Sequence, residues 1–444
     1  MSGMKRKIME KLIAWSVSPN RKPLVVLGAR QVGKTFALKQ FAAKHFDALA
    51  YIDFSRDADA AALFQGSLAP RDLVPALELY LRMTIDPERT LIVFDESQLC
   101  ERSLTALKYF YEDAPQYHII AAGSLLGVQI SRATDSFPVG KVDLLHMHPL
   151  DFEEYLWAVG EVRLSAAIRE ACDAGNVAFP LHERALAHVR DYQLIGGMPE
   201  AVSAFVSAGA NGIEALERAR ERQDAILVGY QADVIKYADK ADATKIISAF
   251  ASVPVQLAKE NHKFQYKEIR SGARASQYVD AIDWLEAAGI ALRCTRTEEG
   301  QAPLATFEER DAFKLYMADT GLLSARYEAL PQDIEPAANK AAAFRGGLAE
   351  NYVYQQICSQ NAKAYCWGTV SRYEVEFVAR TKAGDVIPIE VKSGKNVAST
   401  SLGVYRKKYA PAYSVRVSAR NFGFEGGIKN VPLYAAWCLA EELL

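Results

Sequence analysis

Short apolar runs alternate with amphipathic stretches over the first third of the chain. Four of these runs are rich in branched residues, which predicts buried strands. They are residues 23–28 (PLVVLG), 48–55 (ALAYIDFS), 90–96 (TLIVFDE) and 118–124 (HIIAAGS). Apolar residues at helical spacing lie before and between them, as at Leu73, Leu77 and Leu81. Strands that alternate with helices predict an α/β fold, with a parallel sheet covered by helices on both faces.

The pattern changes after residues 142–147, and the chain is helical in spacing up to about residue 290. Asp151, with Glu154 three residues later, predicts a capping box at the start of the first of these helices. Three helices (244–258, 266–271, 275–288) are expected before three short strands (291–295, 303–307, 313–319). Three helices followed by a small sheet are typical of a winged helix-turn-helix.

Mixed α/β character returns beyond a linker at 330–337. A helix at 345–360 is expected before three strands, a further helix and a last strand. The strands are 364–369, 374–380, 386–392 and 413–419, and the helix between the last two is 400–409.

The amino-acid composition excludes several functional classes for this chain. The 444 residues include 52 Lys and Arg against 54 Asp and Glu, so a uniformly basic coat for nucleic acid is excluded, although a local basic face is not. No apolar run reaches the roughly 18 residues that a membrane span needs. The six cysteines are scattered without a C-x-x-C pair, which indicates reduced thiols. We therefore expect a cytoplasmic protein with no membrane partner.

The strongest chemical signal is the loop at residues 28–35, GARQVGKT, which matches G-x-x-x-x-G-K-[ST] between a predicted strand and a predicted helix. Its glycines let backbone N–H groups surround phosphates, Lys34 reaches the β and γ oxygens, and Thr35 offers a hydroxyl to Mg²⁺. The helix that begins at Lys34 directs its positive end toward the anion. The residues expected to bind a nucleotide here are Gly28, Arg30, Gln31, Val32, Gly33, Lys34 and Thr35.

Further candidates for nucleotide chemistry follow the later strands. Asp95 and Glu96 end an apolar strand, where Asp95 can hold Mg²⁺ and Glu96 can polarise the attacking water; the alternative is two solvated acids. Ser124 can sense the γ-phosphate or simply cap a helix. Arg132 can neutralise charge in trans within an oligomer or lie solvated on the surface.

A second group of charged residues lies in the C-terminal part. Glu350 is on its first helix, Glu376 in a strand, and Glu390 and Lys392 on one face of the next strand. Carboxylates with a lysine can bind Mg²⁺ and activate water for phosphodiester cleavage, the pattern of the restriction-endonuclease-like fold. Glu376 replaces the usual Asp. The pattern leaves open an active nuclease, an inactive fold that binds DNA, and unrelated solvated acids and salt bridges.

Two stretches are locally basic. Residues 390–430 hold eight Lys or Arg against two acids, and residues 259–274 hold five against two, with Phe264 and Tyr266 between them. Both could contact phosphates of DNA, and both could be solvated charged faces.

Several of these segments together resemble one family, the AAA-type ATPases that carry a C-terminal domain of unknown function numbered 4143. The matching segments are RKPLVVLGARQVGKT, LIVFDESQ, AAGSLLGV, SFPVGKVDLLHMHPLDFEEYL, YQLIGGMPEAV, VQLAKENHKFQYKEI, FKLYMADTGLL, FRGGLAENYVYQQ, IPIEVKSG and VSARNFG. The resemblance implies ATP and Mg²⁺ as ligands, bound by Gly33, Lys34, Thr35 and Asp95.

Pattern and resemblance together predict four parts. They are a P-loop AAA-type core with an N-terminal helix (1–160), a helical lid (161–240), a winged helix (241–330) and a restriction-endonuclease-like α/β domain (338–444).

We therefore expect a homo-oligomeric, Mg²⁺-dependent ATPase that couples its nucleotide state to the binding or remodelling of duplex or branched DNA. One alternative is a nucleotide-gated regulatory binding protein with little turnover. Another is a nuclease licensed by ATP.

Overall fold

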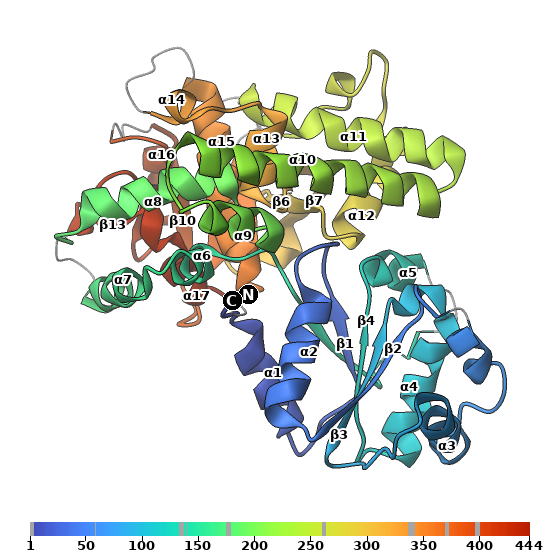
Figure 1. Ribbon diagram of the computed structural model, residues 1–444. Coiled ribbons are helices and arrows are strands. Elements are labelled where there is room, and N and C mark those ends of the chain that lie inside the picture. Colours follow the sequence, from blue (N-terminus) through green and yellow to red (C-terminus); the bar gives the residue numbers. More distant parts are fainter. Residues whose placement is uncertain are drawn as a thin grey trace. The chain divides into compact units, whose positions relative to one another are not determined.

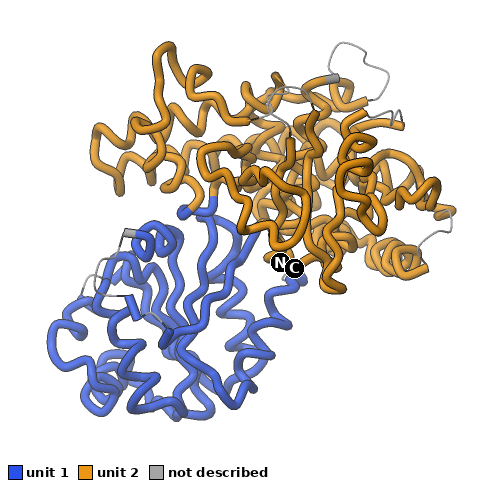
Figure 2. Tube along the Cα trace, turned by 180° about the vertical axis from the view of Figure 1, so that it is seen from behind, with its two compact units in different colours: residues 1–148, 287–289 blue, residues 149–286, 290–444 orange. Residues whose placement is uncertain are grey.

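The computed structural model describes residues 4–57, 59–132, 137–138, 140–174, 179–259, 263–335, 342–368, 373–395 and 400–444. The chain divides into two compact units, one of residues 1–148 with 287–289 and one of residues 149–286 with 290–444 (Figure 2). Over the described ranges, no helix is both long and apolar enough to cross a membrane.

The first unit is built on a parallel sheet, as the sequence predicts; four of its five strands were expected, and β5 is the fifth. Its spatial order is β2-β3-β4-β1-β5. The strands are β1 Leu24–Leu27, β2 Ala48–Asp53, β3 Thr90–Asp95, β4 His118–Ala122 and β5 Asp143–His146. Every residue of β1 and β3 is buried, because helices cover both faces of the sheet.

Helices connect these strands, and in Figure 1 the strands stand between α2 and α4. The helices of the first unit are α1 Ile8–Ser16, α2 Lys34–His45, α3 Pro70–Leu81, α4 Glu101–Asp113 and α5 Leu126–Arg132, with 3-10 turns η1 Asp59–Phe64 and η2 Ser97–Leu99. Because all five strands are parallel, β1 and β3 end at the same edge of the sheet. This edge therefore receives both the loop at 28–35 and Asp95.

The second unit begins with helices. They are α6 Phe152–Ala158, α7 Val162–Ala174, α8 His182–Ile195, α9 Pro199–Ser207, α10 Gly212–Tyr237, α11 Lys240–Ala258 and α12 Ala275–Ala287. The predicted capping box is confirmed, since Asp151 Oδ1 accepts from the Glu154 N–H at 2.9 Å and Glu154 Oε2 accepts from the Asp151 N–H at 3.1 Å.

A mixed sheet of eight strands completes the second unit, in the order β12-β13-β11-β10-β9-β8-β6-β7. The strands are β6 Ala291–Thr297, β7 Glu308–Met317, β8 Ala364–Gly368, β9 Glu374–Arg380, β10 Val386–Val391, β11 Ser414–Ser418, β12 Gly423–Glu425 and β13 Ile428–Pro432. The remaining helices are α13 Thr320–Arg326, α14 Pro331–Ile334, α15 Ala342–Ser359, α16 Thr400–Tyr409 and α17 Ala436–Glu441, with 3-10 turns η3 Tyr266–Glu268, η4 Leu304–Phe307 and η6 Leu433–Ala435.

Two predicted elements of the winged-helix segment are wrong. The expected strand at 303–307 is η4, because Pro303 has no N–H to donate to a sheet. The expected helix at 266–271 is only the turn η3, which Gly272 follows with φ +77°. The hairpin β6–β7 does not stand alone either, since β6 pairs with β8 in parallel, and the two predicted C-terminal parts therefore share one sheet.

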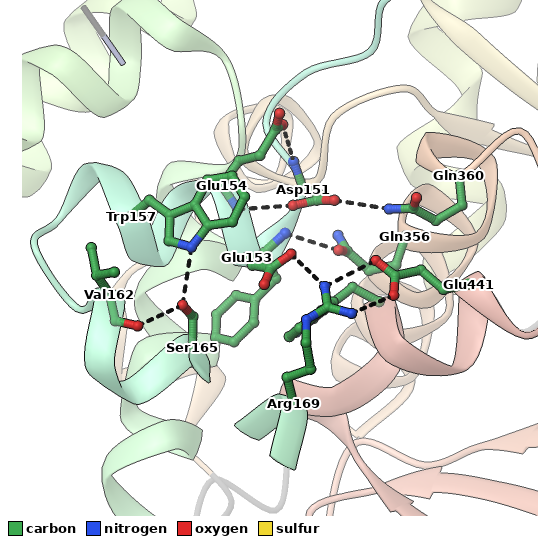
Figure 3. A network of polar contacts seen from close by, with 12 residues as sticks. Asp151, Glu153, Glu154, Trp157, Val162, Ser165, Arg169, Gln356, Gln360 and Glu441 are labelled. Carbon is green, nitrogen blue, oxygen red and sulfur yellow. Dashed lines mark hydrogen bonds and ion pairs between the residues drawn. The ribbon is translucent and has the colours of Figure 1, made fainter. Parts of the chain in front are cut away.

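Polar contacts tie the ends of the second unit together (Figure 3). Arg169 on α7 binds Glu153 on α6 at 2.9 Å and Glu441 on α17 at 2.7 Å. The Gln360 amide donates to Asp151 Oδ2 at 2.9 Å, so the end of α15 meets the start of α6. Segments almost 300 residues apart in sequence thus belong to one folded body.

Candidate nucleotide site and carboxylate cluster

The loop at residues 28–35, here called the phosphate loop, has the backbone shape that its sequence predicts. Gly28, Gln31 and Gly33 have φ of +145°, +65° and +95°. A Cβ on Gly28 would lie 2.2 Å from the Met147 carbonyl oxygen, so only glycine fits there. Helix α2 begins at Lys34, immediately after the loop, so its free N–H groups and positive dipole face any phosphate bound there.

Lys34 lies inside this loop and is 8% exposed. Its Nζ donates to the carbonyl oxygens of Gly28 and Ala29, each at 2.8 Å. Burial lowers the pKa of Lys34 to about 8, although the carboxylates of Glu96 and Asp95 oppose that shift. The ammonium is thus held close to its own loop, where a bound phosphate group would add negative charge beside it.

Thr35 and Asp95, the two predicted Mg²⁺ ligands, are in contact. The Thr35 hydroxyl donates to Asp95 Oδ2 at 2.6 Å, and Asp95 is 2% exposed. The Tyr51 hydroxyl on β2 donates to the same oxygen at 2.7 Å. A hydroxyl and a buried carboxylate beside a phosphate loop suit Mg²⁺, which takes one or two protein oxygens together with nucleotide phosphates. Tyr51 was not among the predicted residues; the available signal was a phenol in the middle of strand β2.

Glu96 leaves β3 in the left-handed conformation, with φ +53°. Its carboxylate accepts from the side-chain amide of Gln98, a residue that was not predicted. The amide oxygen of Gln98 lies 2.0 Å from where a Cβ on Gly123 would stand, so Gln98 reaches the end of β4. Ser124 follows there and is half-buried. Gln98 thus contacts the predicted acid and lies beside Gly123, the residue before the predicted sensor.

Two arginines also belong to this part of the first unit. Arg6, which was not predicted, is buried and donates to carbonyl oxygens of Val32 and His148. No local pattern marks it, because its partners lie 26 and 142 residues away. Arg132 ends α5, and its side chain lies outside the part of the chain that the structure describes.

The four predicted C-terminal residues converge in the second unit. Lys392 Nζ lies 3.5 Å from Glu376 Oε1 and 3.4 Å from Glu390 Oε1. Burial raises the pKa of Glu376 to about 7; Lys392 opposes this shift, whereas Glu350 and Glu390 add to it. Glu350 on α15 is thus close enough for its charge to act on Glu376.

Three residues that the sequence did not suggest also enter this cluster. Lys314 on β7 is 6% exposed, and its Nζ lies 3.0 Å from Glu350 Oε2 and 2.5 Å from Glu374 Oε1. Burial lowers the pKa of Lys314, but Glu350 and Glu374 raise it more, so the pKa stays well above its usual value. Arg416 Nε lies 3.4 Å from Glu390 Oε2. The sequence signal for Lys314 was a charged residue within an otherwise largely apolar strand segment, FKLYM.

We call these residues the ionic cluster: Glu350, Glu374, Glu376, Glu390, Lys314, Lys392 and Arg416. Among the residues that the structure describes, no group of three or more His, Cys, Asp or Glu is arranged to hold a metal ion. The carboxylates of the ionic cluster contact ammonium and guanidinium groups instead.

Family models match most of the chain. One described as an AAA domain matches residues 20–156, and one described as domain of unknown function 4143 matches residues 345–436. The chain thus combines an AAA domain with a C-terminal domain 4143. A third model, domain of unknown function 8612, matches residues 186–333 between them. The resemblance stated from the sequence is thereby confirmed.

Solved structures resemble this AAA-type chain only distantly. An ORC1 protein of Aeropyrum pernix in complex with DNA is 13% identical, with 73% of this chain and 91% of that chain covered and a TM-score of 0.26. The A. pernix ORC2 protein, in ADPNP–ADP complexes, is 12% identical over 72% and 91%, with a TM-score of 0.35. Cdc6p of Pyrobaculum aerophilum is 12% identical over 66% and 88%, with a TM-score of 0.27. Sequence identities and TM-scores this low give no information about the function of this chain. No curated protein matches the chain.

The basic residues of domain 4143 are mostly engaged within the protein. Of the eight Lys and Arg in 390–430, seven contact an acid or a carbonyl oxygen: Lys392, Lys395, Arg406, Lys408, Arg416, Arg420 and Lys429. These contacts leave Lys407 as the candidate for an unengaged charge in that stretch. A locally basic sequence is thus largely neutralised by folding.

The other basic stretch differs. Four of its residues (Lys263, Lys267, Arg270 and Arg274) are exposed, and within the described residues none of the four forms an ion pair; Lys259 alone pairs, with Glu268. Phe264 is buried against Phe313, with ring centroids 5.4 Å apart, so it supports the fold rather than stacking on a base.

Proposed function

We propose that this AAA-type protein hydrolyses ATP with Mg²⁺ at the phosphate loop. The observation that carries the proposal is the contact of Thr35 with Asp95 beside the buried ammonium of Lys34. In this arrangement the loop N–H groups and Lys34 bind the phosphates, and Thr35 with Asp95 would hold Mg²⁺, which neutralises charge on the phosphates when bound.

In this proposal Glu96 orients and polarises the attacking water, and Gln98 holds its carboxylate in place. Ser124 senses the γ-phosphate from the end of β4. Arg132 acts in trans on a neighbouring copy, which makes the active form a homo-oligomer. The alternative is a nucleotide-gated regulatory protein with little turnover.

The test separates binding from turnover. Lys34→Ala should weaken ATP binding and abolish detectable hydrolysis. Glu96→Gln should bind ATP with Mg²⁺ normally but lose about 100-fold or more in kcat, the usual contribution of a general base. Asp53→Asn is a matched control, because Asp53 also ends a strand of this sheet and its carboxylate contacts its sequence neighbours Ser55 and Arg56. If Glu96→Gln and the parent both bind ATP without turnover, the regulatory alternative replaces the ATPase.

We infer DNA as a second partner, on the exposed basic residues of 263–274. Lysine and arginine side chains without internal acid partners are free to contact phosphates. Replacing Lys263, Lys267, Arg270 and Arg274 with Ala should weaken binding of duplex or branched DNA. It should also flatten the plot of log K against log salt by up to about 0.9 for each phosphate that is no longer neutralised.

The control for this DNA surface is Ala at Arg406, Lys407 and Lys408, since two of these three are already engaged within the protein. This triple variant should bind DNA almost as tightly as the parent and keep its salt dependence. Equal effects of the triple and the quadruple variants would contradict the assignment of DNA to residues 263–274.

An ATP-licensed nuclease is the third possibility for this chain, with Glu350, Glu376, Glu390 and Lys392 as its residues. The pairing of Lys392 with Glu376 and Glu390 favours a non-cleaving relic over a metal-dependent enzyme. Cleavage of DNA that requires Mg²⁺ and disappears in Lys392→Ala, with ATP hydrolysis intact, would reverse that preference.

A further inference from the structure

Lys314 is a buried cation in an unexpected place. It stands in β7 between Phe313 and Leu315, both of which are buried, and it is itself 6% exposed. Its Nζ contacts carboxylates from two other elements, Glu350 on α15 and Glu374 on β9. The Tyr316 hydroxyl, two residues further along the same strand, donates to the same Glu350 oxygen at 3.1 Å. One oxygen of the carboxylate that the restriction-endonuclease-like pattern assigns to a metal thus accepts from two residues of β7.

The rest of the ionic cluster is paired in the same way. Lys392 lies between Glu376 and Glu390, and Arg416 contacts the second oxygen of Glu390. Glu376 Oε2 in addition accepts from the Val391 N–H at 3.3 Å. Four carboxylates therefore meet three fixed cations, and these residues do not fit a divalent ion as they stand.

Stability alone does not explain Lys314. Moving an ammonium group out of water costs several kcal/mol, and well-packed apolar residues often replace buried ion pairs without loss. The neighbours of Lys314 in β7 are apolar, so a leucine or methionine would continue the strand. What a cation achieves at this position is neutralisation of carboxylates that converge from separate segments.

We propose that the Lys314 ammonium is a tethered substitute for a divalent metal ion, and that it closes the nuclease-like site of domain 4143 to Mg²⁺ and Mn²⁺. A +1 group between Glu350 and Glu374 both repels a divalent cation and uses the oxygens that would coordinate it. Because Lys314 comes from β7, outside the matched range of domain 4143, this closure is supplied by the preceding hairpin. The proposal is independent of ATP hydrolysis in the first unit.

The experiment uses the full chain without nucleotide, carrying Lys34→Ala and Asp95→Asn so that the phosphate loop binds no metal. In this background Lys314→Met keeps the side-chain length but removes the charge. This variant should bind one Mn²⁺ ion, as measured by calorimetry or electron paramagnetic resonance. Its melting temperature should also rise with the Mn²⁺ concentration. The background protein and its Lys314→Arg form should gain neither, because both keep a cation at position 314.

Specificity is tested by adding Glu350→Gln to Lys314→Met, which should remove the gained Mn²⁺ site. If Lys314→Met does not fold by itself, added Mn²⁺ should restore its folding. The polar variant Lys314→Gln should likewise fold, or be restored, when Mn²⁺ is added. The proposal is overturned if neither variant gains Mn²⁺ binding or rescue. It is equally overturned if the background protein binds Mn²⁺ and loses it in Glu350→Gln, since the site would then be open with Lys314 present.

Discussion

The guanidinium of Arg6 donates to the carbonyl oxygen of Val32 at 2.9 Å, inside the phosphate loop. Its other terminal nitrogen donates to the carbonyl oxygen of His148 at 2.6 Å. Val32 stands between Gln31 and Gly33, the two loop residues with positive φ just before α2. A residue before the first strand thus stabilises the backbone that would surround the phosphates.

Arg6→Ala should therefore raise the KM for ATP and the Kd for ADP by about tenfold, with a smaller change in kcat. A hydrogen bond from a charged group contributes roughly 1.5–3 kcal/mol, and the loop would be without such a bond. Steady-state kinetics and nucleotide titration measure both quantities. Arg6→Lys, which keeps the charge but not the paired nitrogens, should be intermediate.

Arg21→Ala is the matched control, because Arg21 also holds carbonyl oxygens, those of Ser16 and Pro115, but away from the loop. An equal rise in KM in both variants would mean that Arg6 contributes only to general stability.

Nucleotide affinity should fall as the pH rises through about 8. Burial lowers the pKa of Lys34 to about 8 in the absence of nucleotide, so the free protein loses the ammonium charge above that pH. ATP binding measured between pH 6.5 and 9.5 should weaken in the parent. It should be weak and independent of pH in Lys34→Ala. A parent profile that stays flat to pH 9.5 would show that Lys34 remains charged.

Tyr51→Phe should raise the Mg²⁺ concentration that gives half-maximal ATPase activity by about tenfold. The Tyr51 hydroxyl fixes Asp95 Oδ2, and outer contacts of this kind typically change metal affinity by 10- to 100-fold. Nucleotide binding without Mg²⁺ should be unchanged. Tyr80→Phe is the control, since its hydroxyl binds a different acid, Asp57. An unchanged Mg²⁺ requirement in Tyr51→Phe would leave Asp95 positioned by Thr35 alone.

The second unit should lose stability as the pH rises from about 4.5 to 7. Burial raises the pKa of Glu376 from 4.5 to about 7, so over this window the folded chain keeps a proton that the unfolded chain has released. Stability is therefore greatest below the window and falls by roughly 3 kcal/mol at most across it. Urea unfolding at pH 5 and 7.5, followed by tryptophan fluorescence, measures the difference.

Glu376→Gln should remove this dependence on pH, because the amide does not titrate. Glu308→Gln should not remove it, since Lys363 lowers the pKa of Glu308 and its effect has the opposite sign. A parent whose stability rises between pH 5 and 7.5 would contradict the prediction.

Arg169→Ala should destabilise the second unit by about 2 kcal/mol. The guanidinium bridges Glu153 and Glu441 and lies 4.5 Å over the ring of Trp437, so its removal takes an ion pair from the buried Glu153 and the packing against Trp437. Arg184→Ala should cost less than about 1 kcal/mol, because Arg184 is exposed where it pairs with Glu161. Thermal unfolding of the two variants provides the comparison, and equal destabilisation would make the Arg169 bridge an ordinary surface pair.

Local chemistry made much of this protein predictable. The strands of the first sheet, the capping box at Asp151 and the phosphate loop depend on residues only a few positions apart, so the sequence displays them directly. Parallel pairing then brings the ends of β1 and β3 to one edge, which is why the sequence alone groups Lys34, Thr35 and Asp95.

Tertiary structure decided the rest. Whether a charged residue is free depends on which distant segment folds against it. Arg406 and Lys408 read as a basic patch, yet they contact Gly426 and Glu299. Lys314 reads as part of a wing, yet it neutralises Glu350 and Glu374, because β6 joins its hairpin to the sheet of domain 4143. The sequence alone determined which chemical groups the chain carries and the motifs that they form locally; folding determined their partners, since burial requires each charge to find one.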